Sequence, residues 1–178
     1  GCGTLPPAPP PAPADAAAPA GSGNLAEIAR ASTPPGELSG FRLLPLGPYA
    51  LDARLQLVRR AAHSLEVQYY VIADDATGRL LLRELRDAAR RGVRVRLIVD
   101  DLYTAPIDPL LRALAEEPGI EVRLFNPFCC ARGSFGGRFA ASLFDLYRLN
   151  HRMHNKLLVA DGVMAVVGGR NIADEYFM

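Results

Sequence analysis

The sequence predicts an α/β domain with a mixed, largely parallel sheet flanked by helices, after a disordered N-terminal tether. Residues 1–40 are rich in proline and alanine, whereas residues 41–178 alternate strand-like and helix-like runs with short connections. Such alternation favours parallel strands with helices packed across the sheet. Hydrophobic residues make up 49% of the 178 residues, enough for one core.

The predicted tether opens with "GCGTLPPAPPPAPADAAAPAGSG" and ends near "ASTPPGELSG". A stretch with so little charge and so few large apolar groups cannot offset its ordering entropy, so we expect residues 1–40 to be extended. Cys2 at its head resembles the lipid-modified cysteine of bacterial lipoproteins, which predicts lipid anchoring on the periplasmic side of the cell envelope. A stray cysteine at an arbitrary chain end is the alternative.

The region 41–178 opens with two helix and strand pairs. Apolar positions spaced by four and three residues, Leu51, Leu55 and Val58, predict a helix. The β-branched and aromatic run that follows predicts a buried strand from about Leu65 to Ile72. The next helix, "TGRLLLRELRDAARRG", stops at Gly92, and "VRVRLIVDD" is the clearest strand.

The second half of this region ends in a hairpin. A helix over 107–117 and a strand at "GIEVRLFNP" come first, then a loop and a helix near Arg138–Tyr147. Two short strands, Lys156–Ala160 and Val163–Val167, are joined at Asp161-Gly162, a typical hairpin turn. The final "RNIADEYFM" predicts a helix that begins just after Gly168-Gly169.

The stretch "HRMHNKLLVADGVMAVVGGRN" carries the candidate chemistry. Side chains alternate faces on an extended strand, so His154 and Lys156 project from one side. A lysine ammonium can hold the non-bridging oxygens of a phosphodiester, and a histidine can attack phosphorus or carry a proton. Gly168 and Gly169 let the backbone approach a ligand, and a helix start after them would present free N–H groups to an anion. Asn171 adds a neutral donor, and no metal or other cofactor is needed.

The whole spacing, His154-x-Lys156-x4-Asp161-x6-Gly168-Gly169-x-Asn171, resembles the signature of the phospholipase D superfamily. The runs "RLFNPF", "RLNHRMHNKLLVADG", "VGGRNIADEYF" and residues 47–101 resemble the bacterial cardiolipin synthase C-type and phospholipase D-like branch of that family. The likeness covers about 41–178, and it implies one phospholipase D-like half-domain. Many members have serine where this chain has Gly169, and this branch tolerates glycine.

The resemblance implies a phosphatidyltransferase that works through a phosphohistidine intermediate. His154 is then the nucleophile or its general-acid partner, Lys156 and Asn171 hold the phosphate oxygens, and Asp161 tunes the site. His151 is expected to be an exposed loop residue. The implied substrate is a phospholipid at a membrane surface, with phosphatidylglycerol giving cardiolipin. Glu66, Asp100 and Asp101 lie on or just after parallel strands, where acids often cap the next helix, so we expect no direct role for them.

The mechanism needs two such motifs, and the chain has one His-x-Lys. We therefore expect this chain to be the N-terminal half of a longer enzyme, inactive or poorly active alone, with the second motif in the same full-length chain. One alternative is a single-motif nuclease of the same superfamily that pairs two copies in a homodimer. Another is a lipid-anchored domain that binds phospholipid headgroups without turning them over.

Composition argues against several other classes of protein and site. The formal net charge of +1 argues against nucleic acid as the partner, because a strong basic field is missing. No apolar run approaches the length that spans a bilayer. The three cysteines include no Cys-x-x-Cys pair, which argues against a zinc or redox site.

Overall fold

The computed structural model of the chain describes residues 21–36, 38–128, 134–140 and 146–178. Its centre is a mixed sheet of five strands in the order β3-β2-β1-β4-β5. The strands are β1 (Ser64–Tyr69), β2 (Arg94–Asp100), β3 (Ile120–Phe125), β4 (Lys156–Ala160) and β5 (Met164–Val167). β1, β2 and β3 run parallel, and β4 runs antiparallel to both β1 and β5. The predicted fold class is therefore confirmed.

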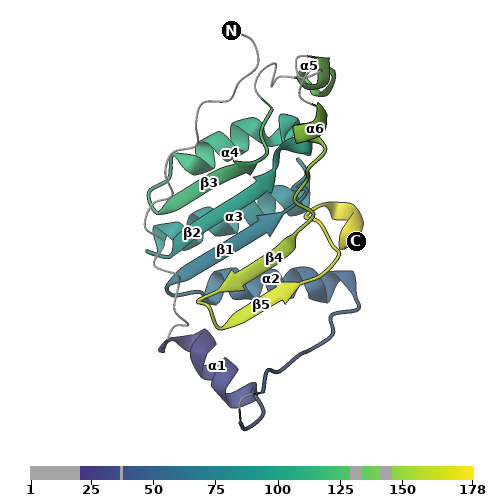
Figure 1. Cartoon of the computed structure of the whole chain (residues 1–178). Coiled ribbons are helices and arrows are strands. Elements are labelled where there is room, and N and C mark those ends of the chain that lie inside the picture. The colour runs from purple at the N-terminus through teal and green to yellow at the C-terminus, as the bar shows by residue number, and fades with distance from the viewer. Residues whose placement is uncertain (1–20, 37, 129–133, 141–145) are drawn as a thin grey trace.

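Three helices cover one face of the sheet (Figure 1). They are α2 (Gly47–Arg60), α3 (Ala76–Arg90) and α4 (Asp108–Ala115), close to the helices predicted from apolar spacing. Each amphipathic helix buries leucines against alternate residues of the strands, such as Val67 and Leu97. Asp75 begins α3 as its N-cap, because its carboxylate accepts a hydrogen bond from the N–H of Gly78 at 2.8 Å.

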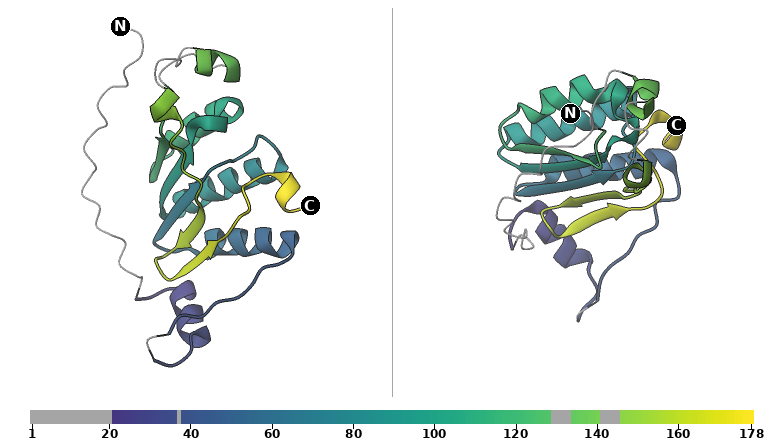
Figure 2. Two further views of the ribbon diagram at one scale, coloured as in Figure 1. Left: turned by 45° about the vertical axis from the view of Figure 1, so that its right-hand side comes forward. Right: turned by 45° about the horizontal axis from the view of Figure 1, so that its top comes forward.

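The prediction of an extended tether to residue 40 is wrong for its second half. Residues Asn24–Ser32 form helix α1, which packs on α2 and on β5 at the edge of the sheet (Figure 2). Leu25 is 1% exposed and belongs to the core, so burial of this face stabilises a helix that composition alone did not predict. Residues 1–20, which include Cys2, lie outside the described residues, and the boundary at residue 40 stays a prediction.

The C-terminal segment also differs from its prediction. The run after Gly169 does not begin a helix, because Ile172 forms a parallel bridge with Ile72 and extends the sheet by one contact. Only a 3-10 turn, Asp174–Tyr176, follows. The backbone N–H of Asp174 donates to Asp75 at 2.8 Å, and this contact with the start of α3 competes with helix formation.

Two further helical segments precede β4. They are α5 (Phe135–Ala140) and α6 (Leu146–Leu149), where one helix near Arg138–Tyr147 was expected. The middle of the expected helix lies outside the described residues. Within the described parts of the chain, none of the helices combines the length and apolar character needed to cross a membrane.

Candidate active site

A cavity of about 790 Å³ opens where β1 and β2 end and β4 begins. This is the edge where open α/β sheets place their ligands, because loops diverge from the carboxyl ends of parallel strands. His154 and Asn171 line the cavity together with three tyrosines, Tyr70, Tyr103 and Tyr176. The predicted motif therefore contributes two side chains directly to the hollow.

His154 lies just before the first residue of β4 and not on the strand itself. The hydrogen bonding between β1 and β4 continues almost to His154, because the N–H of Tyr70 donates to the carbonyl of Asn155 at 3.0 Å. The imidazole, which is exposed, packs on the ring of Tyr70 with 4.6 Å between ring centroids. The histidine is thus open to a ligand on one side and held by an aromatic ring on the other.

Lys156 is the first residue of β4 and is only 7% exposed. Its Nζ donates to the carbonyl of His154 at 2.9 Å and lies 5.1 Å from the centroid of the Tyr70 ring. Burial lowers the pKa of Lys156, because desolvation disfavours the ammonium form. His154 and Lys156 therefore both lie against the ring of Tyr70, which agrees with the predicted projection from one side, although His154 precedes the strand and Lys156 does not line the cavity.

Asn171 is buried and joins the two walls of the cavity. Its Oδ1 accepts a hydrogen bond from the N–H of Val71 at 3.3 Å, and its Nδ2 donates to the hydroxyl of Tyr176 at 3.1 Å. One Nδ2 proton remains for another acceptor, since a primary amide has two. The predicted phosphate-binding asparagine also has a structural role.

The structure does not bring Asp161 to this site. Asp161 follows the last residue of β4, and the seven residues from His154 to Asp161 span about 20 Å when extended. Its carboxylate is buried and accepts hydrogen bonds from the N–H groups of Ala62, His63 and Ser64. Asp161 ties the turn before β5 to the start of β1, at the far end of the sheet.

The glycine pair lies beside the motif but outside the cavity lining. The N–H of Gly168 donates to the carbonyl of Lys156 at 3.3 Å and so continues the β4–β5 ladder. Gly169 is exposed, with open space around it. The expected anion site at a helix start is absent from the described residues, because a 3-10 turn stands in place of that helix.

Asp100, at the end of β2, holds the backbone just before His154. Its buried carboxylate accepts from the guanidinium of Arg152 at 3.0 Å and from the N–H of Met153 at 2.8 Å. Asp101 is also buried and accepts from the N–H of Phe128 at 2.7 Å. Asp100 also caps the 3-10 turn after β2, as expected of an acid at a strand end, because its carboxylate accepts from the N–H of Leu102 at 2.9 Å.

Glu66 and His151, for which we expected no direct role, both lie away from the cavity lining. Glu66 forms an ion pair with Arg96 at 2.6 Å on the sheet. His151 is exposed, as predicted, and its ring stacks edge-on against Tyr147.

The tyrosines of the cavity are the functional candidates that sequence reasoning missed. Tyr70 stacks edge-on with Tyr103, with centroids 5.7 Å apart. Burial, and then the nearby Tyr103, raises the pKa of Tyr70, so its hydroxyl stays protonated at neutral pH. The only signal in the sequence was the adjacent pair Tyr69-Tyr70, which reads equally well as strand packing.

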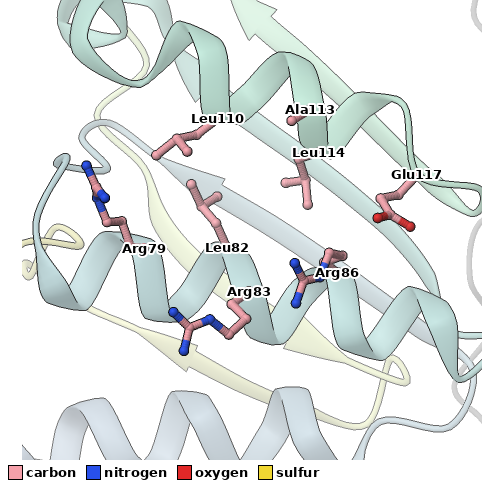
Figure 3. Close-up of a pocket in the computed structure, with 8 residues that line it drawn as sticks. All are labelled: Arg79, Leu82, Arg83, Arg86, Leu110, Ala113, Leu114 and Glu117. Carbon is pink, nitrogen blue, oxygen red and sulfur yellow. The ribbon is translucent and has the colours of Figure 1, made fainter.

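A second hollow, of about 330 Å³, lies between α3 and α4 (Figure 3). Leu82 faces Leu110 and Leu114 across it, and arginines line its rim. It contains none of the predicted site residues. Within the described part of the chain, no three His, Cys, Asp or Glu side chains are grouped as metal ligands are.

The fold is an α/β domain that brings a histidine and a lysine together at the edge of its sheet where the cavity opens. The profile of the family described as "Cardiolipin synthase, PLD-like domain" matches residues 55–177. The chain belongs to this family, within the phospholipase D superfamily.

Named relatives agree with this assignment. Cardiolipin synthase C of Escherichia coli is 53% identical over 129 residues, which is 72% of this chain and 26% of that protein. A cardiolipin synthase of Staphylococcus aureus is 33% identical over 73% of this chain and 24% of its own length. The chain thus spans about a quarter of the length of these relatives.

Among solved structures, NucT from Helicobacter pylori superposes with a TM-score of 0.52 at 19% identity, over 72% of this chain and 70% of that one. At this identity the similarity supports the fold alone.

Proposed function

We propose that this domain supplies one half of the active site of a phosphatidyltransferase that makes cardiolipin from phosphatidylglycerol. The observation that carries the proposal is that His154, which lines the open cavity, and the buried Lys156 both lie against the ring of Tyr70. A nucleophilic imidazole beside an ammonium suits an anionic phosphodiester. The family profile and the names of the relatives support the choice of phospholipid.

The reaction consists of two displacements at one phosphorus. An imidazole nitrogen of His154 attacks, a P–N bond forms, and the P–O bond to the leaving glycerol breaks as a second histidine protonates that oxygen. The hydroxyl of another phosphatidylglycerol then attacks phosphorus, loses its proton to the second histidine and releases His154. Lys156 neutralises charge on the non-bridging oxygens, and the free proton of Asn171 donates to one of them.

The second histidine has to come from outside this chain, whose other histidines are His63 and His151. His63 lies at the start of β1, at the Asp161 end of the sheet, and His151 is stacked on Tyr147. A second motif in the same full-length protein is the simplest source. A second copy of this chain, related by a two-fold axis, is the other source.

We also propose that Cys2 is lipid-modified and anchors the domain on the periplasmic side of the cell envelope. The proline- and alanine-rich run after it would give the domain reach toward the bilayer. Mass analysis of the native protein tests this idea. An unmodified N-terminal cysteine would rule it out.

The deciding experiment incubates protein from the complete gene with phosphatidylglycerol and separates the products by mass. Wild type should yield cardiolipin and glycerol, and His154→Ala should yield neither. His151→Ala is the matched control, because His151 is an exposed histidine three residues away that does not line the cavity. Its yield should equal that of wild type.

Other outcomes of this assay would support a different function. Phosphatidic acid alone would indicate a phospholipase that uses water as the acceptor. DNA cleavage without lipid turnover would support the homodimeric nuclease. Binding of phosphatidylglycerol without any product, in wild type and both variants, would indicate a headgroup-binding domain.

A further inference from the structure

The segment that leads into α2 exposes an unusual number of apolar side chains. Phe41 and Leu43 are 94% and 90% exposed, and Leu38, Leu46 and Tyr49 are each more than half exposed. Single exposed leucines are common on protein surfaces, but residues 38–49 carry five such side chains within twelve residues, an apolar patch along one stretch of the chain. Such a patch indicates a contact surface.

The second half of this segment lies at the cavity end of the sheet, whereas Phe41 and Arg42 border a groove that α1 and β5 also line. The guanidinium of Arg170 donates to the carbonyls of Leu44 and Pro45, at 3.2 and 2.7 Å. Gly47 backs so closely onto Phe177 that a Cβ would lie 2.9 Å from its Cα. Both contacts are made with the 170–177 loop, which contributes Asn171 and Tyr176 to the cavity wall. Figure 2 shows this loop and the start of α2 side by side.

The charges around the patch are complementary to an anionic surface. Between Leu38 and Leu51 the one charged residue is Arg42, which is exposed. Arg170 adds a second cation beside the same backbone. A run of leucine and aromatic side chains with arginine suits the interface of a bilayer that contains anionic lipids.

The backbone of the segment favours a lipid surface over a protein partner. It has neither helical nor strand structure before α2, so it offers no strand edge for pairing and no helix face for a groove. Pro45 and Pro48 remove two backbone donors from it. Apolar side chains on an irregular loop can still enter a bilayer interface, provided that the backbone stays near the headgroups.

We propose that residues 38–49 form a docking segment that inserts its exposed side chains into the surface of an anionic phospholipid bilayer. Docking there would place the cavity mouth near the headgroups, where the substrate phosphodiester lies. The benefit to turnover rests on the proposed function, whereas binding to the bilayer does not.

The test uses protein from the complete gene in which every version carries Cys2→Ser, so that the proposed lipid anchor cannot hold it on vesicles, together with vesicles of phosphatidylethanolamine mixed with phosphatidylglycerol. The double variant Phe41→Ser, Leu43→Ser should partition onto vesicles about tenfold more weakly than wild type in flotation. Tyr147→Ser is the matched control, because Tyr147 is an 87% exposed aromatic residue outside the segment. Its partitioning should equal that of wild type. Pure phosphatidylcholine vesicles should bind all three proteins less well, since they lack net negative charge.

A second measurement separates this proposal from the proposed function. Turnover of a short-chain phosphatidylglycerol, dispersed as monomers, should be the same in the double variant and in wild type. Loss of vesicle binding with normal turnover of monomers supports the docking segment. Unchanged vesicle binding in the double variant overturns it, whether or not the protein turns over lipid. A change of oligomeric state or reduced stability, with vesicle binding intact, would indicate instead that protein covers the patch.

Discussion

Asp161 holds two distant segments together, and its replacement should be costly for stability. Its carboxylate is 1% exposed and accepts hydrogen bonds from three successive N–H groups, those of Ala62, His63 and Ser64, at 2.8 to 3.2 Å. A hydrogen bond to a charged group contributes about 1.5–3 kcal/mol to stability. The N–H groups of Ala62 and His63 are only partly buried and can bond to water when the carboxylate is removed, so the lower end of this range applies to each bond. Asp161→Ala should lower the free energy of unfolding by about 4 kcal/mol.

Asp161→Asn is the matched variant. Asparagine keeps one side-chain oxygen for the same N–H groups, and it tolerates the left-handed backbone that Asp161 adopts with φ 52°. Asp161→Asn should lower the free energy of unfolding by about 1–2 kcal/mol, because the charge is lost but the hydrogen-bond geometry is kept. Urea denaturation followed by circular dichroism measures both values. Lipid turnover is measured at a temperature where both variants are folded.

A structural carboxylate and a catalytic one give opposite patterns in this pair of assays. If Asp161 acts only through the fold, folded Asp161→Ala retains most of its turnover while its unfolding free energy falls. Lost turnover in both variants, with unfolding free energies close to wild type, would refute the reasoning. It would mean that Asp161 acts on substrate in spite of the distance of about 20 Å along β4.

Three further predictions follow from single contacts. Lys156→Met should abolish turnover. It should also remove the rise in the free energy of unfolding that wild type shows as alkaline pH takes the proton from this lysine, because burial lowers the pKa of Lys156. Urea denaturation at neutral and alkaline pH measures this difference, and the same pH response in both proteins would contradict it. Tyr70→Leu should reduce kcat about 10- to 100-fold by loosening His154, whereas Tyr70→Phe keeps the ring and should stay near wild type. Steady-state kinetics with equal losses in both would contradict the stacking role. Leu25→Ala should lower the free energy of unfolding by about 2–3 kcal/mol, measured by thermal or urea denaturation. An unchanged free energy would mean that α1 is not packed on the core.

The local pattern of the sequence was sufficient wherever one element could be identified from its own residues. The apolar spacing of Leu55 and Val58 predicted α2, and the alternation in "VRVRLIVDD" predicted β2. The order of helices and strands then predicted parallel pairing. Strand periodicity of two predicted that His154 and Lys156 project from one side; His154 lies just before β4, yet both side chains lie against Tyr70.

The local pattern failed where distant residues compete with local preference. The run after Gly169 has helical composition, but Ile172 pairs with Ile72 and Asp174 contacts Asp75, so the backbone stays extended before its short turn. Asn24–Ser32 follows a proline-rich run, yet Leu25 finds a core in which to be buried. Neither partner can be identified from the segment itself.

The sequence alone determined the class of fold, the family signature and the pairing of a histidine with a lysine, because all three depend on spacing along one chain. The tertiary structure decided what surrounds them. It brought Tyr70 against both His154 and Lys156, assigned Asn171 to a cavity wall, and left Asp161 at the opposite end of the strand. These relations depend on which strands lie side by side and in which direction each runs, and hydrogen bonds between residues about a hundred positions apart set that arrangement.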